Sequence, residues 1–244
     1  MAIAYRTDPG SKRHDNEDYV GSFINKVGRT MVIVADGVTS NEGGEVASAM
    51  TVEHFGHAWE SNDLETIVPT IAWLKKQAKI ENDAIIKAGQ RFQELSQMAT
   101  TVVLAVLFDE KVVIANLGDS KAFLLHNNQL TLLSNDHILK NEIVRRGAMA
   151  SADASNMVHA NSVTRFLGVD EHADIEISQH DFVADDILFL TSDGITKVLD
   201  YKTIKQIMRY EEPLDIKVFD MIQQANEKGA PDNVTAVLVT HEKD

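Results

Sequence analysis

The chain has 244 residues, contains no cysteine, and carries 37 acidic against 23 basic residues, for a formal net charge of −14. Disulfides and thiolate chemistry are therefore excluded, and nucleic acid or an anionic membrane is disfavoured as a partner. The N-terminus lacks the apolar core of a signal peptide and no stretch is long enough to cross a bilayer, which predicts a cytoplasmic protein with no membrane partner. No linker-like stretch interrupts the chain, so we expect one domain over residues 1–244.

Strand-like and helix-like patterns follow one another along the chain in a definite order. A strand pair ends at Asp36, and two helices follow, the second within residues 66–98, where Pro69 is either a first-turn residue or a break. Residues 100–133 form four short β-rich runs, whose close spacing predicts antiparallel neighbours in a β-meander. A polar segment over 136–161 starts as a helix, and a strand, two helices and a last strand complete the chain. This order predicts an α+β layered domain.

Two apolar runs end at an Asp-Gly pair, Asp36-Gly37 in "VIVADGVTSNEGGE" and Asp193-Gly194 in "ILFLTSDGIT". Asp-Gly is typical of hairpin turns, but helical spacing of apolar residues follows each pair. Both pairs therefore mark places where a strand is followed by a helix. Close packing of the first such helix on the sheet explains Gly43-Gly44 without a bound phosphate.

Acidic residues stand beside Gly or Asn at the ends of several apolar runs. The full set is Glu17, Asp18, Asp36, Asp119, Asp193 and Asp232. Carboxylates that meet at one edge of a layered domain would repel one another, and hard divalent cations relieve that repulsion. Oxygen ligands without cysteine favour Mg²⁺ or Mn²⁺ over zinc. Two such ions can activate a bridging water and stabilise charge on a transferring phosphoryl group, and Arg13 is suited to bind the phosphate.

Eight motifs occur in order over almost the whole chain: "GSKRHDNED", "VADGVTSNEGGEVAS", "TTVVLAVL", "ANLGDSKAFLL", "LLSNDH", "RFLG", "LFLTSDGIT" and "PDNVTAVLV". With these motifs the chain resembles the PP2C-type (PPM) metal-dependent serine/threonine protein phosphatases in their compact bacterial form. The resemblance implies a four-layer αββα sandwich, with two packed antiparallel sheets flanked by helix pairs. It also implies hydrolysis of phosphomonoesters by direct attack of a metal-activated water. Phosphorylated proteins would be the substrates of a monomeric enzyme that opposes a Ser/Thr kinase.

The resemblance also assigns roles to residues of this sequence. Arg13 and Asp36 are the implied catalytic residues, with Arg13 on the phosphate. The implied ligands of two Mn²⁺ or Mg²⁺ ions are Asp36 as the bridge, the Gly37 carbonyl on one ion, Asp193 and Asp232 on the other, and Glu17 and Asp18 directly or through water. A third ion is implied at Asp119 and Asp193, and residues 140–163 fall where the family carries a mobile flap beside the site.

The sequence departs from the family pattern at several positions. The family's "DGMGG" is "DGVTS" here, so Val38 stands where some members have a histidine proposed as general acid, and two glycines are replaced. "GDSR" becomes "GDSK" at Lys121, and "VHANSVTRFLG" keeps too little of the family pattern for flap contacts to be transferred. The general acid stays open, with His14 and His159 as alternatives.

Two other functions are alternatives for this sequence. A non-catalytic binding or sensing module of the same fold would be favoured by loss of a metal aspartate, and none is lost. An aspartyl-phosphate phosphotransferase would want an Asp-x-Asp motif after the first strand, which is absent.

We expect His54 and His57 to face solvent without binding metal, and His137 to cap and pack a helix start.

Overall fold

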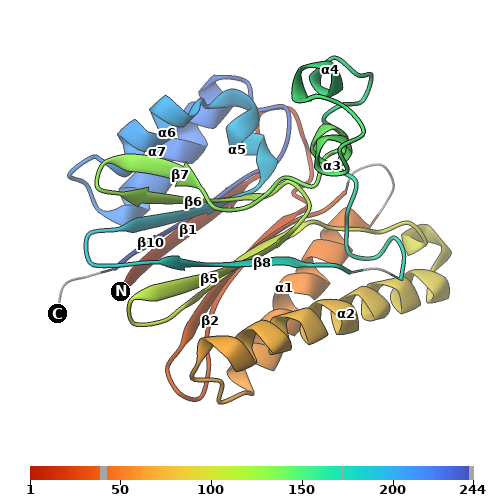
Figure 1. Ribbon diagram of the computed structural model, residues 1–244, viewed down its shortest axis with the longest axis horizontal. Coiled ribbons are helices and arrows are strands. Elements are labelled where there is room, and N and C mark those ends of the chain that lie inside the picture. The colour runs from red at the N-terminus through yellow and green to blue at the C-terminus, as the bar shows by residue number, and fades with distance from the viewer. Residues whose placement is uncertain (39–42, 172, 242–244) are drawn as a thin grey trace.

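The protein folds into two five-stranded antiparallel sheets that pack face to face (Figure 1). The structure, a computed structural model, describes residues 1–38, 43–171 and 173–241. The β1 sheet has the strand order β1-β10-β9-β6-β7, and the β2 sheet has the order β2-β3-β4-β5-β8. The strands are β1 (Ala2–Asp8), β2 (Asp18–Ile24), β3 (Thr30–Asp36), β4 (Val102–Leu107), β5 (Lys111–Leu117), β6 (Lys121–His126), β7 (Gln129–Leu132), β8 (Glu176–Asp181), β9 (Ile187–Thr191) and β10 (Val234–Thr240).

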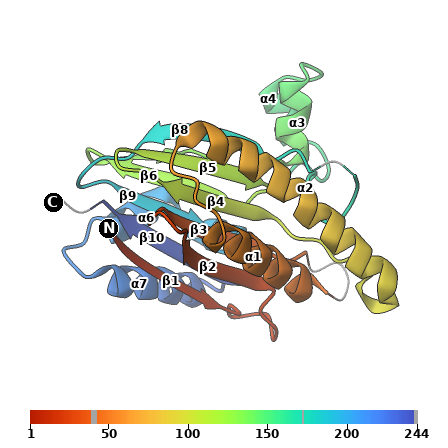
Figure 2. The ribbon, with the colours of Figure 1, turned by 90° about the horizontal axis from the view of Figure 1, so that it is seen from below.

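Helices cover the outer face of each sheet, as Figure 2 shows for α1 and α2 on the β2 sheet and for α7 on the β1 sheet. The helices are α1 (Gly44–Glu60), α2 (Ile67–Arg91), α3 (Leu139–Arg145), α4 (Ser151–Ser155), α5 (Asp193–Val198), α6 (Tyr201–Met208) and α7 (Leu214–Glu227), with a 3-10 turn at Gln93–Leu95. The predicted αββα sandwich is confirmed, and the short α5 is added to the second helix pair. Pro69 lies in the first turn of α2. Backbone N–H groups in this turn have no partner within the helix, so proline, which lacks an N–H, is tolerated there.

Strand β3 shows how the sequence produces three apolar layers. Its five central residues are fully buried, and alternate side chains point to opposite faces of the sheet. Met31, Ile33 and Ala35 pack against α1 and α2, whereas Val32 and Val34 pack between the two sheets. A strand buried on both faces reads as a continuous apolar run, which explains the run that precedes Asp36.

Two strands and one helix were not anticipated from the sequence. β1 and β8 are edge strands, and much of each is exposed or only half-buried. Edge strands need no apolar residues on the side that faces water, so neither gives a clear apolar run. The segment after Asp193 folds into three helices because Leu199 has an extended backbone that ends α5, and the side chain of Asp200 then caps a new helix by accepting from the Thr203 N–H.

The predicted β-meander over 100–133 is wrong in its topology. β4 pairs with β5 in the β2 sheet, and β6 pairs with β7 in the β1 sheet, so the chain changes sheets between β5 and β6. Gly118 permits this crossing because its φ of 116° is unfavourable for residues that have a Cβ. The crossing places Asp119 at an end of the sandwich where both sheets meet.

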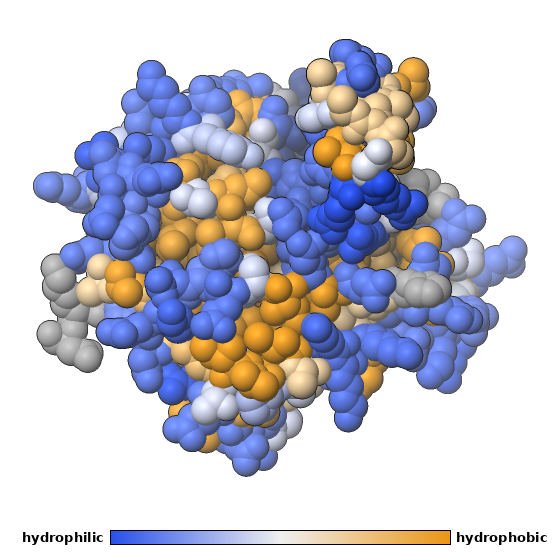
Figure 3. Space-filling view, in the orientation of Figure 1, coloured by the Kyte–Doolittle hydropathy of each residue, from blue (hydrophilic) through white to orange (hydrophobic). Residues whose placement is uncertain are grey.

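Residues 140–163 carry most of α3 and all of α4, which stand away from the sandwich (Figures 1 and 2). In the space-filling view of Figure 3 this segment forms a separate lobe at the upper right of the face shown. No helix in the described part of the chain has the length and apolar composition needed to cross a membrane.

Candidate active site

Five predicted aspartates lie at chain positions where elements of both sheets end. Asp36 is the last residue of β3 and is the cross-strand partner of Asp18, the first residue of β2. Asp119 lies in the crossing between β5 and β6, Asp193 begins α5 directly after β9, and Asp232 precedes β10. Segments far apart in the sequence thus converge at one end of the sandwich, which we call the carboxylate rim.

The aspartates of the rim are close enough to affect one another's ionisation. The pKa of Asp36 is raised well above its ordinary value of 3.8, first by burial and then by the negative charges of Asp18, Asp193, Asp119 and Asp232. Each of these charges disfavours ionisation of Asp36 because like charges at short range repel. Asp36 is therefore the common electrostatic neighbour of the other four aspartates.

Asp18 is buried, with one carboxylate oxygen engaged and the other free of hydrogen bonds. Its Oδ2 accepts hydrogen bonds from Ser192 Oγ at 2.7 Å and Thr235 Oγ1 at 2.6 Å. Burial raises the pKa of Asp18 to about 7, although the two hydroxyl donors oppose this rise. Oδ1 of Asp18 and Oδ1 of Asp193 are buried without a hydrogen-bond partner among the described residues. Buried, unpartnered carboxylate oxygens fit the ligand set of a hard divalent cation.

Two cationic side chains occupy the oxygens of Asp232. Arg13 Nη2 lies 3.1 Å from Oδ1, and Lys197 Nζ lies 2.9 Å from Oδ2. Lys197 Nζ is also 2.7 Å from Oδ2 of Asp193. Partial burial lowers the pKa of Lys197, but the two carboxylates raise it further, so that the net change is upward. Sequence reasoning missed Lys197, whose only signal is its i,i+4 spacing from Asp193 in a short helix.

Both Asp-Gly pairs have a glycine because another backbone approaches closely at that point. A Cβ on Gly37 would lie 2.4 Å from the backbone of Gly44, and a Cβ on Gly194 would lie 1.9 Å from the carbonyl oxygen of Asn233. The first contact confirms that Gly44 serves close packing of α1, whereas Gly43 has a φ of 105° that favours glycine. The second holds the start of α5 against the loop that carries Asp232. Glycine therefore allows the aspartates before it to be drawn to one rim.

Asn233 fixes the N-terminal loop beside the rim, and sequence reasoning did not identify it. Its Nδ2 donates to the carbonyls of Pro9 and Asp15 at 2.9 and 2.8 Å, and its Oδ1 accepts from the backbone N–H of Glu17 at 2.9 Å. The Glu17 carbonyl in turn accepts from Gly37 N at 3.0 Å. Burial, followed by the charge of a neighbouring glutamate, raises the pKa of Glu17. The loop that carries Arg13 is thereby attached to the segment beside Gly194 through Asn233, and to Gly37 through the Glu17 carbonyl.

Asp119 lies in a turn held by a lysine and a histidine. Burial and the charge of Asp193 raise the pKa of Asp119 to about 7, and Lys121 opposes this rise. Lys121 Nζ donates to the Asp119 carbonyl at 2.8 Å and pairs with Asp136 at 3.0 Å. His137 is fully buried and its Nδ1 accepts from Gly118 N at 3.1 Å. The lysine of "GDSK" therefore has a structural partner of its own.

The histidine interpretations are confirmed in part. His137 packs as expected but caps no helix, because the N-cap of α3 is Ile138 and no side chain caps it. His54 and His57 are exposed as expected, and His54 Nδ1 also lies 2.7 Å from the buried Glu81. Among residues 1–38, 43–171 and 173–241, no three His, Asp or Glu side chains stand ready as a closed ligand set. Metal binding at the rim would therefore require the carboxylates to move together.

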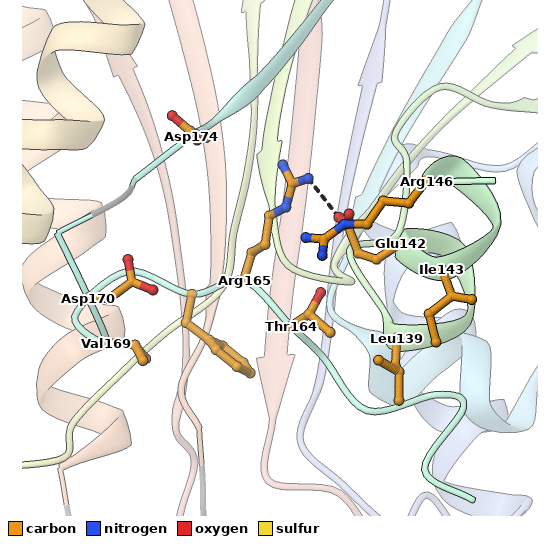
Figure 4. Close-up of a pocket in the computed structure, with 10 residues that line it drawn as sticks. Leu139, Glu142, Ile143, Arg146, Thr164, Arg165, Val169, Asp170 and Asp174 are labelled. Atoms are coloured by element: carbon orange, nitrogen blue, oxygen red, sulfur yellow. Dashed lines mark ion pairs between the residues drawn. The ribbon is translucent and has the colours of Figure 1, made fainter. Parts of the chain in front are cut away.

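A chain of contacts links the flap segment to the rim. The Asp36 carbonyl accepts from Thr100 Oγ1 at 2.9 Å, and Thr100 exchanges backbone hydrogen bonds with Leu167. Nearby, Arg165 pairs with Glu142 of α3 at 2.7 Å across a pocket of about 360 Å³ (Figure 4). Of the "DGVTS" loop, Val38 donates its N–H to the Ala99 carbonyl, while residues 39 and 40 lie outside the described residues.

An αββα sandwich with an acidic rim and an adjoining arginine defines a class of protein suited to metal-assisted phosphate chemistry. The family model described as protein phosphatase 2C matches residues 11–239. The serine/threonine phosphatase Stp of Listeria welshimeri is 38% identical over 240 residues, which are 98% of this chain and 95% of that protein. The chain therefore belongs to the protein phosphatase 2C family.

Two solved structures are similar over nearly the whole chain. The S. agalactiae serine/threonine phosphatase matches with a TM-score of 0.91 and 30% identity, over 98% of this chain and 99% of that one. The catalytic domain of the phosphatase PstP, solved in complex with two manganese ions, matches with a TM-score of 0.83 and 25% identity, over 99% of this chain and 98% of that one.

Proposed function

We propose that the carboxylate rim is the active centre of a metal-dependent protein serine/threonine phosphatase. The protein hydrolyses phosphoserine and phosphothreonine monoesters on other proteins. The observation that carries this assignment is the cluster of aspartates around Asp36, in which one buried oxygen each of Asp18 and Asp193 has no hydrogen-bond partner among the described residues. Such a cluster is unfavourable unless it binds cations, since every carboxylate in it is repelled by the others.

The residues that would hold two Mn²⁺ or Mg²⁺ ions are distributed around Asp36. Asp36 would be shared between the ions. One ion would use the Gly37 carbonyl and the other would use Asp193 and Asp232. Glu17 and Asp18 would bind directly or through water, and Asp119 and Asp193 would be available to a third ion. When bound, the ions would supply positive charge to the phosphoryl group and lower the pKa of the attacking water.

Arg13 has the task of binding and orienting the substrate phosphate. Its side chain is exposed and is already positioned at the rim by the pairing with Asp232 and by a hydrogen bond from Nε to the Pro231 carbonyl at 3.3 Å. Arginine has five N–H donors, so further donors remain for a phosphate oxygen. The chain lacks cysteine and the Asp-x-Asp motif, so neither a phosphocysteine nor an aspartyl-phosphate intermediate has support.

The domain organisation and partners follow from the same proposal. Residues 1–244 act as one monomeric domain, and the flap over residues 140–163 controls access of the phosphorylated segment to the rim. The ion pair between Glu142 and Arg165 supports this role because it connects α3 with the segment that contacts Thr100 beside Asp36. The biological partner would be a Ser/Thr kinase that phosphorylates the same proteins.

The test is hydrolysis of an aryl phosphate and of matched phosphothreonine and phosphotyrosine peptides, with Mn²⁺ and with EDTA. We expect activity that requires Mn²⁺ and favours phosphothreonine. Asp193→Asn should remove this activity and leave the circular dichroism spectrum unchanged, whereas Asp63→Asn, at an exposed loop position, should retain it. A binding module would show no turnover with any substrate, and wild-type turnover by Asp193→Asn would contradict the site assignment.

A further inference from the structure

Lys197 bridges two of the proposed metal ligands. Its Nζ lies 2.7 Å from Asp193 and 2.9 Å from Asp232. These aspartates come from different segments, the start of α5 and the loop before β10. A single positive charge that joins two carboxylates does what a divalent cation would do at this place: it neutralises them and holds the two segments together.

The Lys197 side chain is also partly accessible to solvent. The Lys197 side chain is 41% exposed, and it lines a pocket that opens beside the rim and also includes Lys140 and Thr196. Lysine has a long, flexible side chain whose strongly hydrated head group is readily accommodated in water. Lys197 occupies Oδ2 of both aspartates and Arg13 occupies Oδ1 of Asp232, so an ion that binds either Oδ2 atom must displace the lysine.

We propose that Lys197 is a built-in counter-ion that competes with a divalent ion for Asp193 and Asp232 and thereby sets the metal affinity of that side of the centre. This inference rests on the proposed function. In the metal-free protein Lys197 relieves repulsion at the rim. In the loaded protein the same residue weakens metal binding, because its two ion pairs must be broken first.

Replacement of Lys197 should therefore lower the stability of the metal-free protein and raise its affinity for the metal ion. Lys197→Gln should make the metal-free fold less stable and the metal-bound form easier to reach. A purely structural lysine would weaken both states, and a residue with no role would change neither. The opposite signs are the signature of competition between a side chain and an ion for the same ligands.

The matched control is Lys140→Gln. Lys140 lines the same pocket and carries the same charge, but forms no ion pair within the described ranges. The two variants change the net charge of an acidic protein equally, so any general increase in cation attraction is common to both. Only the specific contacts of Lys197 with Asp193 and Asp232 differ between them.

The experiment is calorimetric titration of the EDTA-treated full chain with Mn²⁺, together with thermal unfolding in EDTA. We expect Lys197→Gln to bind Mn²⁺ about tenfold more tightly than wild type, as two partly exposed ion pairs imply. Its metal-free melting temperature should fall by a few degrees, and Lys140→Gln should match wild type in both measurements.

The outcomes separate this inference from the function on which it rests. Unchanged or weaker Mn²⁺ binding by Lys197→Gln, alongside normal binding by wild type, would overturn the competition and leave the phosphatase assignment intact. If both variants bound Mn²⁺ more tightly by the same factor, the effect would be one of net charge, and the proposed competition would also be overturned. If wild type itself bound no Mn²⁺ and hydrolysed no phosphate ester, the proposed function and the inference would fall together.

Discussion

Replacing Asp18 with asparagine should stabilise the metal-free protein at neutral and alkaline pH. The Asp18 side chain is buried, its Oδ2 accepts two hydroxyl hydrogen bonds, and its Oδ1 has no partner in the described chain. An amide oxygen can accept the same bonds from Ser192 and Thr235. The amide nitrogen then replaces the unpartnered oxygen and is able to donate towards neighbouring carboxylates.

The size of the effect follows from the raised pKa of Asp18. Burial raises this pKa from 3.8 to about 7, so between these pH values the folded chain keeps a proton that the unfolded chain has lost. The stability of the wild type therefore falls as pH rises through this window, and the loss is complete above about pH 7. A rise of this size corresponds to about 4 kcal/mol. The variant lacks the titrating group but still buries a polar amide, so we expect a gain of about 2–4 kcal/mol at pH 8.

The assay is urea unfolding in EDTA at pH 6, 7 and 8, all above the isoelectric point near 5.0. The stability difference between Asp18→Asn and wild type should widen by about 1 kcal/mol from pH 6 to pH 8. Asp63→Asn, which also removes one carboxylate, should follow the wild type at every pH. A variant no more stable than wild type at pH 8, or a difference independent of pH, would refute the reasoning.

Three further variants test other parts of the site with steady-state kinetics. Arg13→Ala should raise KM for aryl phosphate about tenfold with a smaller fall in kcat, because the guanidinium already binds the ground-state dianion; an unchanged KM would place Arg13 away from the substrate. Asp119→Ala should leave two Mn²⁺ ions detectable by calorimetry while kcat falls at least about tenfold; loss of all tight binding would make Asp119 a ligand of the two-ion core. Val38→His should speed phosphopeptide hydrolysis more than aryl phosphate hydrolysis, since only the serine or threonine alkoxide needs a proton donor; equal effects would indicate that another group already protonates the leaving oxygen.

Several features of this protein could be predicted from the sequence because they depend on local chemistry. The apolar run before Asp36 identifies a strand buried on both faces, and the helical spacing after Gly44 identifies α1. Oxygen ligands without cysteine indicate a hard divalent ion. The binding of phosphate by Arg13 stays a prediction. Each of these inferences needs only a residue and its near neighbours in the chain.

Other features became visible only in the tertiary structure. Periodicity records that a side chain is buried but does not record which segment buries it. The sequence therefore could not reveal that Asp18 pairs with Asp36 across two strands, that the chain changes sheets at Gly118, or that Asn233 holds the N-terminal loop. The edge strands β1 and β8 were missed for the same reason, since their partners, and not their own residues, define them.

Lys197 shows most clearly the difference between what the sequence determines and what the fold determines. In the sequence it is an ordinary helix residue four positions after an aspartate. In the folded chain its ammonium also meets Asp232, because Gly194 lets the start of α5 approach the loop before β10. Sequence alone determined which chemical groups the rim contains. Only the fold decided their neighbours, because the energy of a charge depends on the distances to all surrounding charges and on its burial, and those distances join segments remote in the chain.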